Sequence, residues 1–289
     1  MNPQVINLSK KNEFLKYNIG KNIFDFKFAY VMGILNVTSD SFSDGGLFID
    51  KEIAVKYALE MIESGADIID IGGESTRPGS EPVSEFEELK RVIPIIEEIL
   101  KLKPDAILSI DTTKAKVVKE ALGIGVLIVN DISGGTFEPN IFEVASGFKA
   151  AMVLMHIKGK PKTMQVSPEY SDVVIEVYDY LANQSAIASK HGIEKIIVDP
   201  GIGFGKKLEH NLTIINRLED FKTLGFPILI GLSRKSFIGN ILNLAVEERD
   251  DATNSMNMLA LCKGVRIIRT HNVKQAVQTC KLFNKIITD

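Results

Sequence analysis

The stretch VMGILNVTSDSFSDGG (residues 31–46) joins six residues typical of a buried strand to a run of polar residues and two glycines. One such stretch is compatible with an ordinary turn, so its meaning depends on whether the pattern recurs. Seven further apolar runs of strand length follow it, and each also ends in polar groups. The eight runs span residues 28–37, 66–73, 106–111, 126–132, 150–157, 195–201, 227–233 and 265–271.

These runs are almost continuously hydrophobic, as is typical of parallel strands covered on both faces. Helical patterns lie between them, for example at 84–101, where Ser84 and Glu87 have the spacing of a capping box. The pattern at 139–147 is the shortest and the least regular. Eight strand–helix units in about 260 residues predict an α/β fold of the (β/α)8 TIM barrel type. On periodicity alone, a doubly wound open sheet is the structural alternative.

The N-terminal residues 1–27 carry no strand–helix unit. Their pattern resembles a short hairpin, and we expect an extension that closes the floor of a barrel formed by residues 28–289. We find no linker and no low-complexity segment between these two parts.

The composition excludes several classes of protein. The chain has 289 residues with 45% hydrophobic and 25% charged residues, which is ordinary for a globular protein with a sizeable core. Its net charge of −3 gives no indication of binding to nucleic acid or to an anionic membrane. No apolar run approaches the ~20 residues of a membrane helix, and the first residues lack the apolar stretch of a secretory signal. With two cysteines, a disulfide framework and a thiolate metal site are excluded, and we expect a reducing cytoplasm.

Polar side chains follow every predicted strand. They are Asn36, Glu74 to Arg77, Asp111, Asn130 and Asp131, His156, Asp199, Ser233 to Lys235, and Arg269 with His271. Each alone has a simpler interpretation, such as a helix cap, a turn or a core histidine. In a parallel barrel, however, all strand ends converge on one rim, where active sites of this fold are built. One polar cavity accounts for the eight groups better than eight separate coincidences.

The groups on this rim divide by chemistry. The acceptor-rich side chains are Asp111, Asn130 and Asp199, which suit a ligand edge with several N–H donors. The cationic side chains are Arg77, Arg234, Lys235, Arg269 and His271, which suit phosphate oxygens. The rim therefore favours a nitrogen-rich heterocycle that bears phosphate.

The segment DPGIGFGKK (199–207) superficially resembles a phosphate-binding loop. That motif requires four residues between its glycines and a Ser or Thr after the lysine, and this segment has neither. Its glycines instead allow close approach of the backbone to a flat ring, with Asp199 accepting hydrogen bonds from that ring.

The motifs together resemble dihydropteroate synthase, from about residue 29 to the C-terminus. The segments that carry the resemblance are MGILNVTSDSFSDGG, GGESTRPGS, SIDTTK, VNDISGG, VLMHIKGKPKTMQ, DPGIGFGK, GLSRKSFIG and RTHNV. The resemblance implies a (β/α)8 barrel that joins 6-hydroxymethyl-7,8-dihydropterin diphosphate to p-aminobenzoate, giving 7,8-dihydropteroate and pyrophosphate in folate biosynthesis. It also implies Mg²⁺, inhibition by sulfonamides and a homodimer.

The resemblance further implies a role for individual residues. The expected catalytic residues are Asp111, Lys235, Arg269 and His271. The expected pterin-binding residues are Asp111, Asn130, Met155, Asp199, Phe204 and Lys235. The expected pyrophosphate-binding residues are Asn36, Arg77, Arg269 and His271, with Asn36 also linked to the metal. The expected p-aminobenzoate-binding residues are Phe42, Thr76, Arg77, Pro78, Phe204, Ser233 and Lys235.

The chain departs from the family pattern at three places: Ser39 stands where Pro is usual, Ile157 and Lys158 replace the more usual Met-Arg after His156, and Asn272 stands where Asp is commoner. Two other functions remain as alternatives. A barrel that transfers the methyl group of methyltetrahydrofolate would share the pterin floor but has no use for cations around a pyrophosphate. A pterin-binding protein without catalysis is the second alternative, and the presence of Asn36, Arg77 and Lys235 argues against it.

Overall fold

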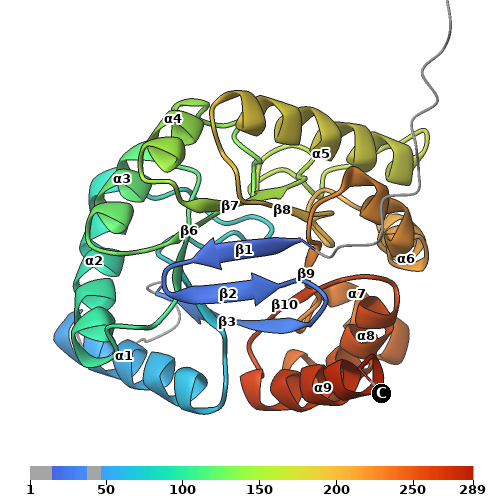
Figure 1. Cartoon of the computed structure of the whole chain (residues 1–289). Coiled ribbons are helices and arrows are strands. Elements are labelled where there is room, and N and C mark those ends of the chain that lie inside the picture. The colour runs from blue at the N-terminus through green and yellow to red at the C-terminus, as the bar shows by residue number, and fades with distance from the viewer. Residues whose placement is uncertain (1–14, 38–46, 289) are drawn as a thin grey trace, which may run out of the picture.

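Eight parallel strands form the centre of the molecule in a computed structural model, whose described residues are 15–37 and 47–288 (Figure 1). The strands are β3 (Tyr30–Asn36), β4 (Ile68–Gly72), β5 (Leu108–Asp111), β6 (Ile128–Asp131), β7 (Ala151–Met155), β8 (Ile196–Asp199), β9 (Leu229–Gly231) and β10 (Ile267–Thr270). Their hydrogen-bonded order is β8-β7-β6-β5-β4-β3-β10-β9, and a bridge between Val198 and Ile228 joins the two outer strands. This confirms the predicted barrel, and the open-sheet alternative is wrong.

Helices surround the ring of strands, so that each strand is followed by a helical segment (Figure 1). They are α1 (Leu47–Glu63), α2 (Glu85–Leu102), α3 (Ala115–Gly123), α4 (Asn140–Gly147), α5 (Val173–Lys190), α6 (Leu208–Asn216) with the 3-10 helix η1 (Leu218–Leu224), α7 (Ser236–Leu242), the 3-10 helix η2 (Val246–Glu248), α8 (Asp250–Cys262) and α9 (Val273–Ile286). Ser84 caps α2 by accepting a hydrogen bond from the Glu87 amide, as its spacing predicts. The short helix α7 was not predicted. None of the helices in the described ranges is long and apolar enough to cross a membrane.

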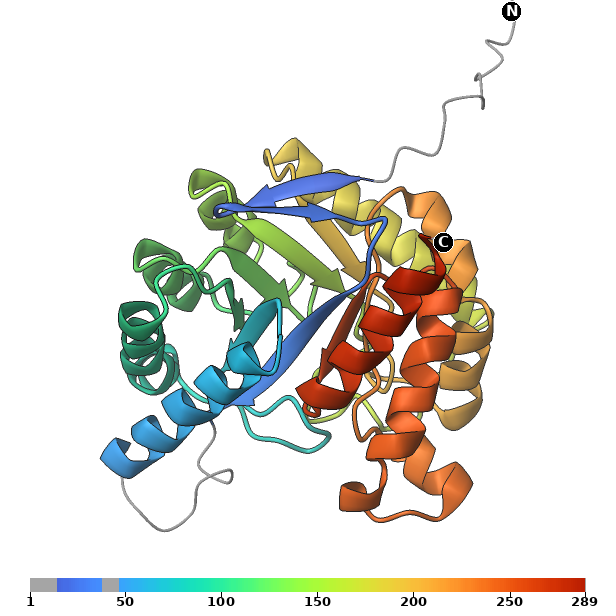
Figure 2. The same ribbon diagram turned by 60° about the horizontal axis from the view of Figure 1, so that its bottom comes forward.

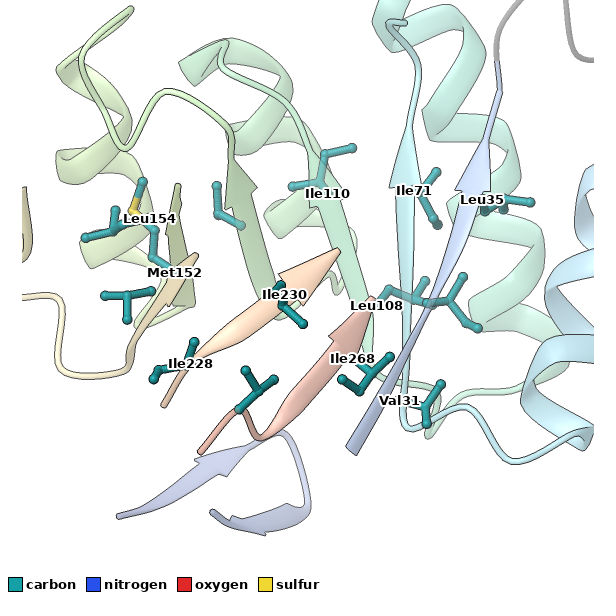
Figure 3. Close-up of a cluster of buried hydrophobic side chains, with 14 of the residues drawn as sticks. Val31, Leu35, Ile71, Leu108, Ile110, Met152, Leu154, Ile228, Ile230 and Ile268 are labelled. Atoms are coloured by element: carbon teal, nitrogen blue, oxygen red, sulfur yellow. The ribbon is translucent and has the colours of Figure 1, made fainter. Parts of the chain in front are cut away.

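Alternate residues along each strand face the helices and the barrel interior, as the period of a strand requires. Figure 3 shows part of the layer between strands and helices. Its labelled side chains are Val31, Leu35, Ile71, Leu108, Ile110, Met152, Leu154, Ile228, Ile230 and Ile268, and all belong to one buried cluster. Burial of each such aliphatic side chain contributes about 1.5–3 kcal/mol. This layer holds the strand ends, and the polar groups after them, in fixed positions.

The first two strands form the hairpin expected in the N-terminal extension. β1 (Lys16–Ile19) and β2 (Asn22–Asp25) pair antiparallel and lie across one end of the barrel (Figures 1 and 2). The buried hairpin side chains are Tyr17, Ile19, Phe24 and Phe26, which pack on Met32, Ile68, Ile107, Ile128, Ala151, Val153, Ile197, Leu229 and Ile267 at the strand starts. The Tyr17 hydroxyl also donates a 2.8 Å hydrogen bond to the Ile196 carbonyl. The expectation that the hairpin closes the floor is therefore confirmed.

Candidate active site

Arg269 lies at the centre of a buried polar network near the carboxyl ends of the strands. Its Nε donates to Asp70 Oδ2 at 2.6 Å, and its second guanidinium nitrogen donates to Asp111 Oδ2 at 2.7 Å. Asn130 Nδ2 also donates to Asp70 Oδ2, at 2.8 Å. β10, β4, β5 and β6 thus each supply one side chain to the interior of the barrel. Three of these residues were predicted for the site, and the structure brings them together.

Asp70 was missed by the sequence argument, although it is fully buried and binds two of the predicted residues. The predicted site residues lie near the ends of their strands or follow them, whereas Asp70 lies inside β4. It could have been found from the strand period, because it occupies an inward position two residues after Ile68 of the floor cluster. A charge at an inward position of a hydrophobic strand is a strong signal, since buried charges need partners.

Two carboxyl groups at this network, those of Asp111 and Asp199, have raised pKa values. Burial raises the pKa of Asp111 to about 7, although the Arg269 guanidinium opposes the shift. Burial also raises the pKa of Asp199 to about 6, and the Gly201 amide, which donates to Asp199 Oδ1 at 2.7 Å, opposes it. A cationic group near these carboxyl groups would therefore stabilise their ionised form.

Lys235 follows β9 and lies over the Phe204 ring, with Nζ 4.1 Å from the ring centroid. Burial lowers the pKa of Lys235 to about 8, while the nearby Asp199 carboxylate opposes that shift. Phe204 packs with Ile132 and Met155 in a small apolar cluster. Met155 also pairs in register with Asp199 across β7 and β8. The predicted pterin-binding residues from four strands and two loops therefore face one region.

Ser233 and His271 are joined by a hydrogen bond of 2.9 Å between Oγ and Nδ1. Burial, followed by the charge of Arg269, lowers the pKa of His271 to about 4. The ring is therefore neutral at neutral pH, and it would bind phosphate as a hydrogen-bond donor rather than as the cation that the sequence suggested.

Arg234 does not belong with the free cations of the rim. Its guanidinium forms a two-bond ion pair with Asp250, at 2.8 and 3.0 Å. Asn272 Nδ2 donates to the same carboxylate at 3.1 Å, and the Asn272 side chain also caps α9. The departure at Asn272 thus gives a neutral partner to Asp250. The backbone of Arg234 has φ of 56°, a conformation rare for a residue with a side chain.

The segment after β4 contributes the outer wall of the site. Thr76 lines a cavity of about 440 Å³ together with Asp111, while Arg77 and Pro78 are exposed. The Gly79 amide donates to the Pro161 carbonyl at 3.2 Å, which ties this segment to the one after β7. Arg77 lies near enough to His271 for its charge to help lower the pKa of that ring.

Asn36 ends β3 and lies in register with Gly72 of β4, on the same rim. In the described ranges, no group of three or more His, Cys, Asp or Glu side chains could hold a metal ion by itself. The side-chain oxygen of Asn36 nevertheless suits Mg²⁺, which commonly takes one or two protein oxygens and completes its shell with substrate phosphates and water. The predicted p-aminobenzoate residue Phe42 and the departure at Ser39 lie outside the described residues.

Comparison with known proteins gives consistent results. A family model described as pterin binding enzyme matches residues 32–271. The dihydropteroate synthase of Synechocystis sp. is 49% identical over 272 residues, covering 93% of this chain and 94% of the relative. That of Escherichia coli K12 is 45% identical over 266 residues, covering 91% and 94%.

Solved structures agree with these relatives. The dihydropteroate synthase of Yersinia pestis with a sulfonamide drug superimposes with a TM-score of 0.89 at 38% identity, covering 95% of this chain and all (100%) of the other. The Xanthomonas albilineans enzyme with 4-aminobenzoic acid gives 0.87 at 36% identity, covering 94% and 97%. The chain therefore belongs to the dihydropteroate synthase family of pterin-binding enzymes.

Proposed function

We propose that this enzyme condenses 6-hydroxymethyl-7,8-dihydropterin diphosphate with p-aminobenzoate, at the network centred on Arg269. The observation that supports this most is the pairing of buried carboxyl groups with buried cations at one open end of a barrel closed at the other. The carboxyl groups suit the N–H edge of a pterin, and the cations suit its diphosphate.

In this proposal, the pterin-binding residues are Asp111, Asn130, Met155, Asp199, Phe204 and Lys235. Departure of pyrophosphate leaves positive charge on the pterin methylene group. The carboxylates of Asp111 and Asp199 stabilise that charge, because they are buried where electrostatic interactions are strong. Their raised pKa values indicate that each favours a nearby positive charge.

The leaving pyrophosphate is bound by Asn36, Arg77, Arg269 and His271 in this proposal. Arg269 is held rigidly by two carboxylates, so little reorganisation is needed as charge develops on the leaving group. Asn36 would hold Mg²⁺, which when bound would supply positive charge for the leaving group.

The second substrate, p-aminobenzoate, is bound by Phe42, Thr76, Arg77, Pro78, Phe204, Ser233 and Lys235 in this proposal. Its neutral amine is already nucleophilic and requires positioning more than activation. Lys235 over the face of Phe204 provides a fixed wall for an aromatic ring.

We also propose a homodimer in a reducing cytoplasm, with residues 28–289 as the catalytic unit. Exposed apolar side chains occur on consecutive elements near the C-terminus, which supports an interface there: Ile241, Leu242, Val246, Leu259, Leu282 and Ile286. A solution mass equal to one chain would contradict the dimer.

Of the two cysteines, Cys280 is buried, which fits a compartment without disulfide formation.

Product formation from the two substrates by purified protein, with Mg²⁺ and with a chelator, tests the reaction. We expect dihydropteroate only with the metal, and inhibition by a sulfonamide that competes with p-aminobenzoate. Lys235→Ala and Arg269→Ala should each lower kcat/KM by at least about 100-fold, because each removes a group from a preorganised site. Tight binding of the pterin diphosphate without product would favour a binding protein, and failure to bind would contradict the site itself.

A further inference from the structure

Lys206 is a buried lysine that the proposed reaction does not use. It ends the DPGIGFGK segment after β8, and only 2% of its surface is exposed. Its Nζ donates to the Gly201 carbonyl at 2.8 Å and to the Phe204 carbonyl at 3.1 Å. Nζ also lies 2.9 Å from His156 Nδ1 and 3.4 Å from the His156 carbonyl. The amino group is therefore surrounded by neutral hydrogen-bonding groups of the loop and of His156.

Burial of the Lys206 amino group is unfavourable for folding unless its contacts compensate. No salt bridge of Lys206 to a carboxylate is present in the described part of the chain, and burial lowers the pKa of Lys206 well below its usual value. Burial together with Lys206 lowers the pKa of His156 to about 2, so its imidazole is neutral and shares a hydrogen bond with the Lys206 amino group through Nδ1. The contacts instead close a loop, since they draw the carbonyls of residues 201 and 204 toward one point.

The loop so closed (residues 201–205) is packed tightly on the segment after β7. A Cβ atom at Gly201 would lie 1.9 Å from the His156 carbonyl oxygen, so the two segments touch through their backbones. The Gly203 amide donates to Asn211 Oδ1 at 2.7 Å, which fixes the loop on its other side. The free face of the loop presents Phe204 and Gly203 to Lys235. Lys206 therefore reaches the site through this loop, and it also lies close enough to Asp199 for the two groups to interact electrostatically.

We propose that Lys206 is a positioning residue, whose amino group sets the conformation of residues 201–205 through its hydrogen bonds to the Gly201 and Phe204 carbonyls. Through this loop it places the Phe204 ring, and with it Lys235, at the position that both substrates require. The proposal rests on the proposed function for its effect on substrates, whereas its effect on the loop is independent of that function.

Lys206→Met tests the proposal, because methionine keeps an unbranched apolar side chain and lacks the terminal amino group. We expect the KM for p-aminobenzoate to rise about tenfold while kcat changes less than about threefold, since a displaced wall weakens binding without removing a reacting group. Amide hydrogen exchange in residues 201–206 should become at least about tenfold faster. The melting temperature separates this effect from general destabilisation.

Tyr17→Phe is the matched control. It removes a buried hydrogen bond to Ile196, at the opposite end of the same strand β8. We expect it to lower the melting temperature and to leave both KM values and exchange in residues 201–206 unchanged. If Lys206→Met behaves like this control, or like the unaltered enzyme, the positioning role is overturned.

A second pair of variants covers the case in which Lys206→Met does not fold. His156→Asn retains a hydrogen-bonding partner for the Lys206 amino group and should keep a KM within about threefold of the unaltered value, whereas His156→Leu should raise it about tenfold. Equal KM values for the pair would overturn the proposal. If the unaltered protein makes no product, the proposed function fails, and hydrogen exchange in residues 201–206 still decides the role of Lys206.

Discussion

Asp70 holds two of the residues assigned to substrates, and it does so from the interior of a strand. Its Oδ2 accepts from both Arg269 and Asn130, while its Oδ1 has no partner among the described residues. A carboxylate in this position compensates the charge of Arg269 and fixes the plane of the guanidinium. The orientation of Arg269 toward Asp111 therefore depends on a residue that need not touch any substrate.

Asp70→Asn should weaken both the fold and catalysis. The amide cannot compensate the buried guanidinium, so we expect a loss of about 3 kcal/mol in the free energy of unfolding, measured with urea. We also expect kcat/KM to fall at least about tenfold, because Arg269 loses its orientation. Asp67→Asn is the control. Asp67 lies just before β4, the strand of Asp70, and accepts a hydrogen bond from the Val31 amide. Its replacement should leave kcat/KM unchanged. Equal kcat/KM for Asp70→Asn and the unaltered enzyme would contradict this account.

The protonation of Lys235 should limit activity at alkaline pH. Because burial lowers its pKa to about 8, the side chain loses its charge as the pH rises through that value. We expect kcat/KM to fall above about pH 8 with a slope of one proton. Lys235→Arg keeps its charge throughout this range, so in that weakly active variant the alkaline decline should disappear. A decline at the same pH in both proteins would assign it to another group.

The N-terminal hairpin is an element whose role is confined to the floor. Phe24 of β2 is buried in the cluster formed with the strand starts, whereas its neighbour Ile23 is 67% exposed. The two residues occupy opposite faces of the same strand, as its period requires. The hairpin therefore offers a direct comparison of a buried and an exposed apolar side chain in one element.

Phe24→Ala should lower the free energy of unfolding by about 3–5 kcal/mol, the range for removing a buried aromatic side chain. Ile23→Ala should change it by less than about 0.5 kcal/mol. Urea denaturation measures both values. In the folded state, kcat/KM should be unaltered in each variant, because the floor lies at the opposite end of the strands from the polar rim. A selective loss of kcat/KM in Phe24→Ala would show that the floor also shapes the site.

At the scale of the molecule, the ring of strands was predictable because each strand is a hydrophobic run of its own. The rim was predictable because parallel strands bring their ends together. The partners within the rim were not predictable. Pairing of Arg269 with Asp70 joins residues 199 positions apart, and pairing of Arg234 with Asp250 depends on how two neighbouring segments pack. The neutral state of His271 depends on burial, which spacing does not report.

Because the hairpin closes the floor, the described part of the barrel is accessible from the rim end. The hairpin fills one end with aromatic side chains, so no small molecule passes through the barrel axis from that side. Both substrates must enter and both products must leave through the same opening. A product that leaves the opening slowly therefore delays the entry of the next substrate. Under the proposed reaction, turnover depends on the order in which molecules clear this entrance as well as on the chemistry inside.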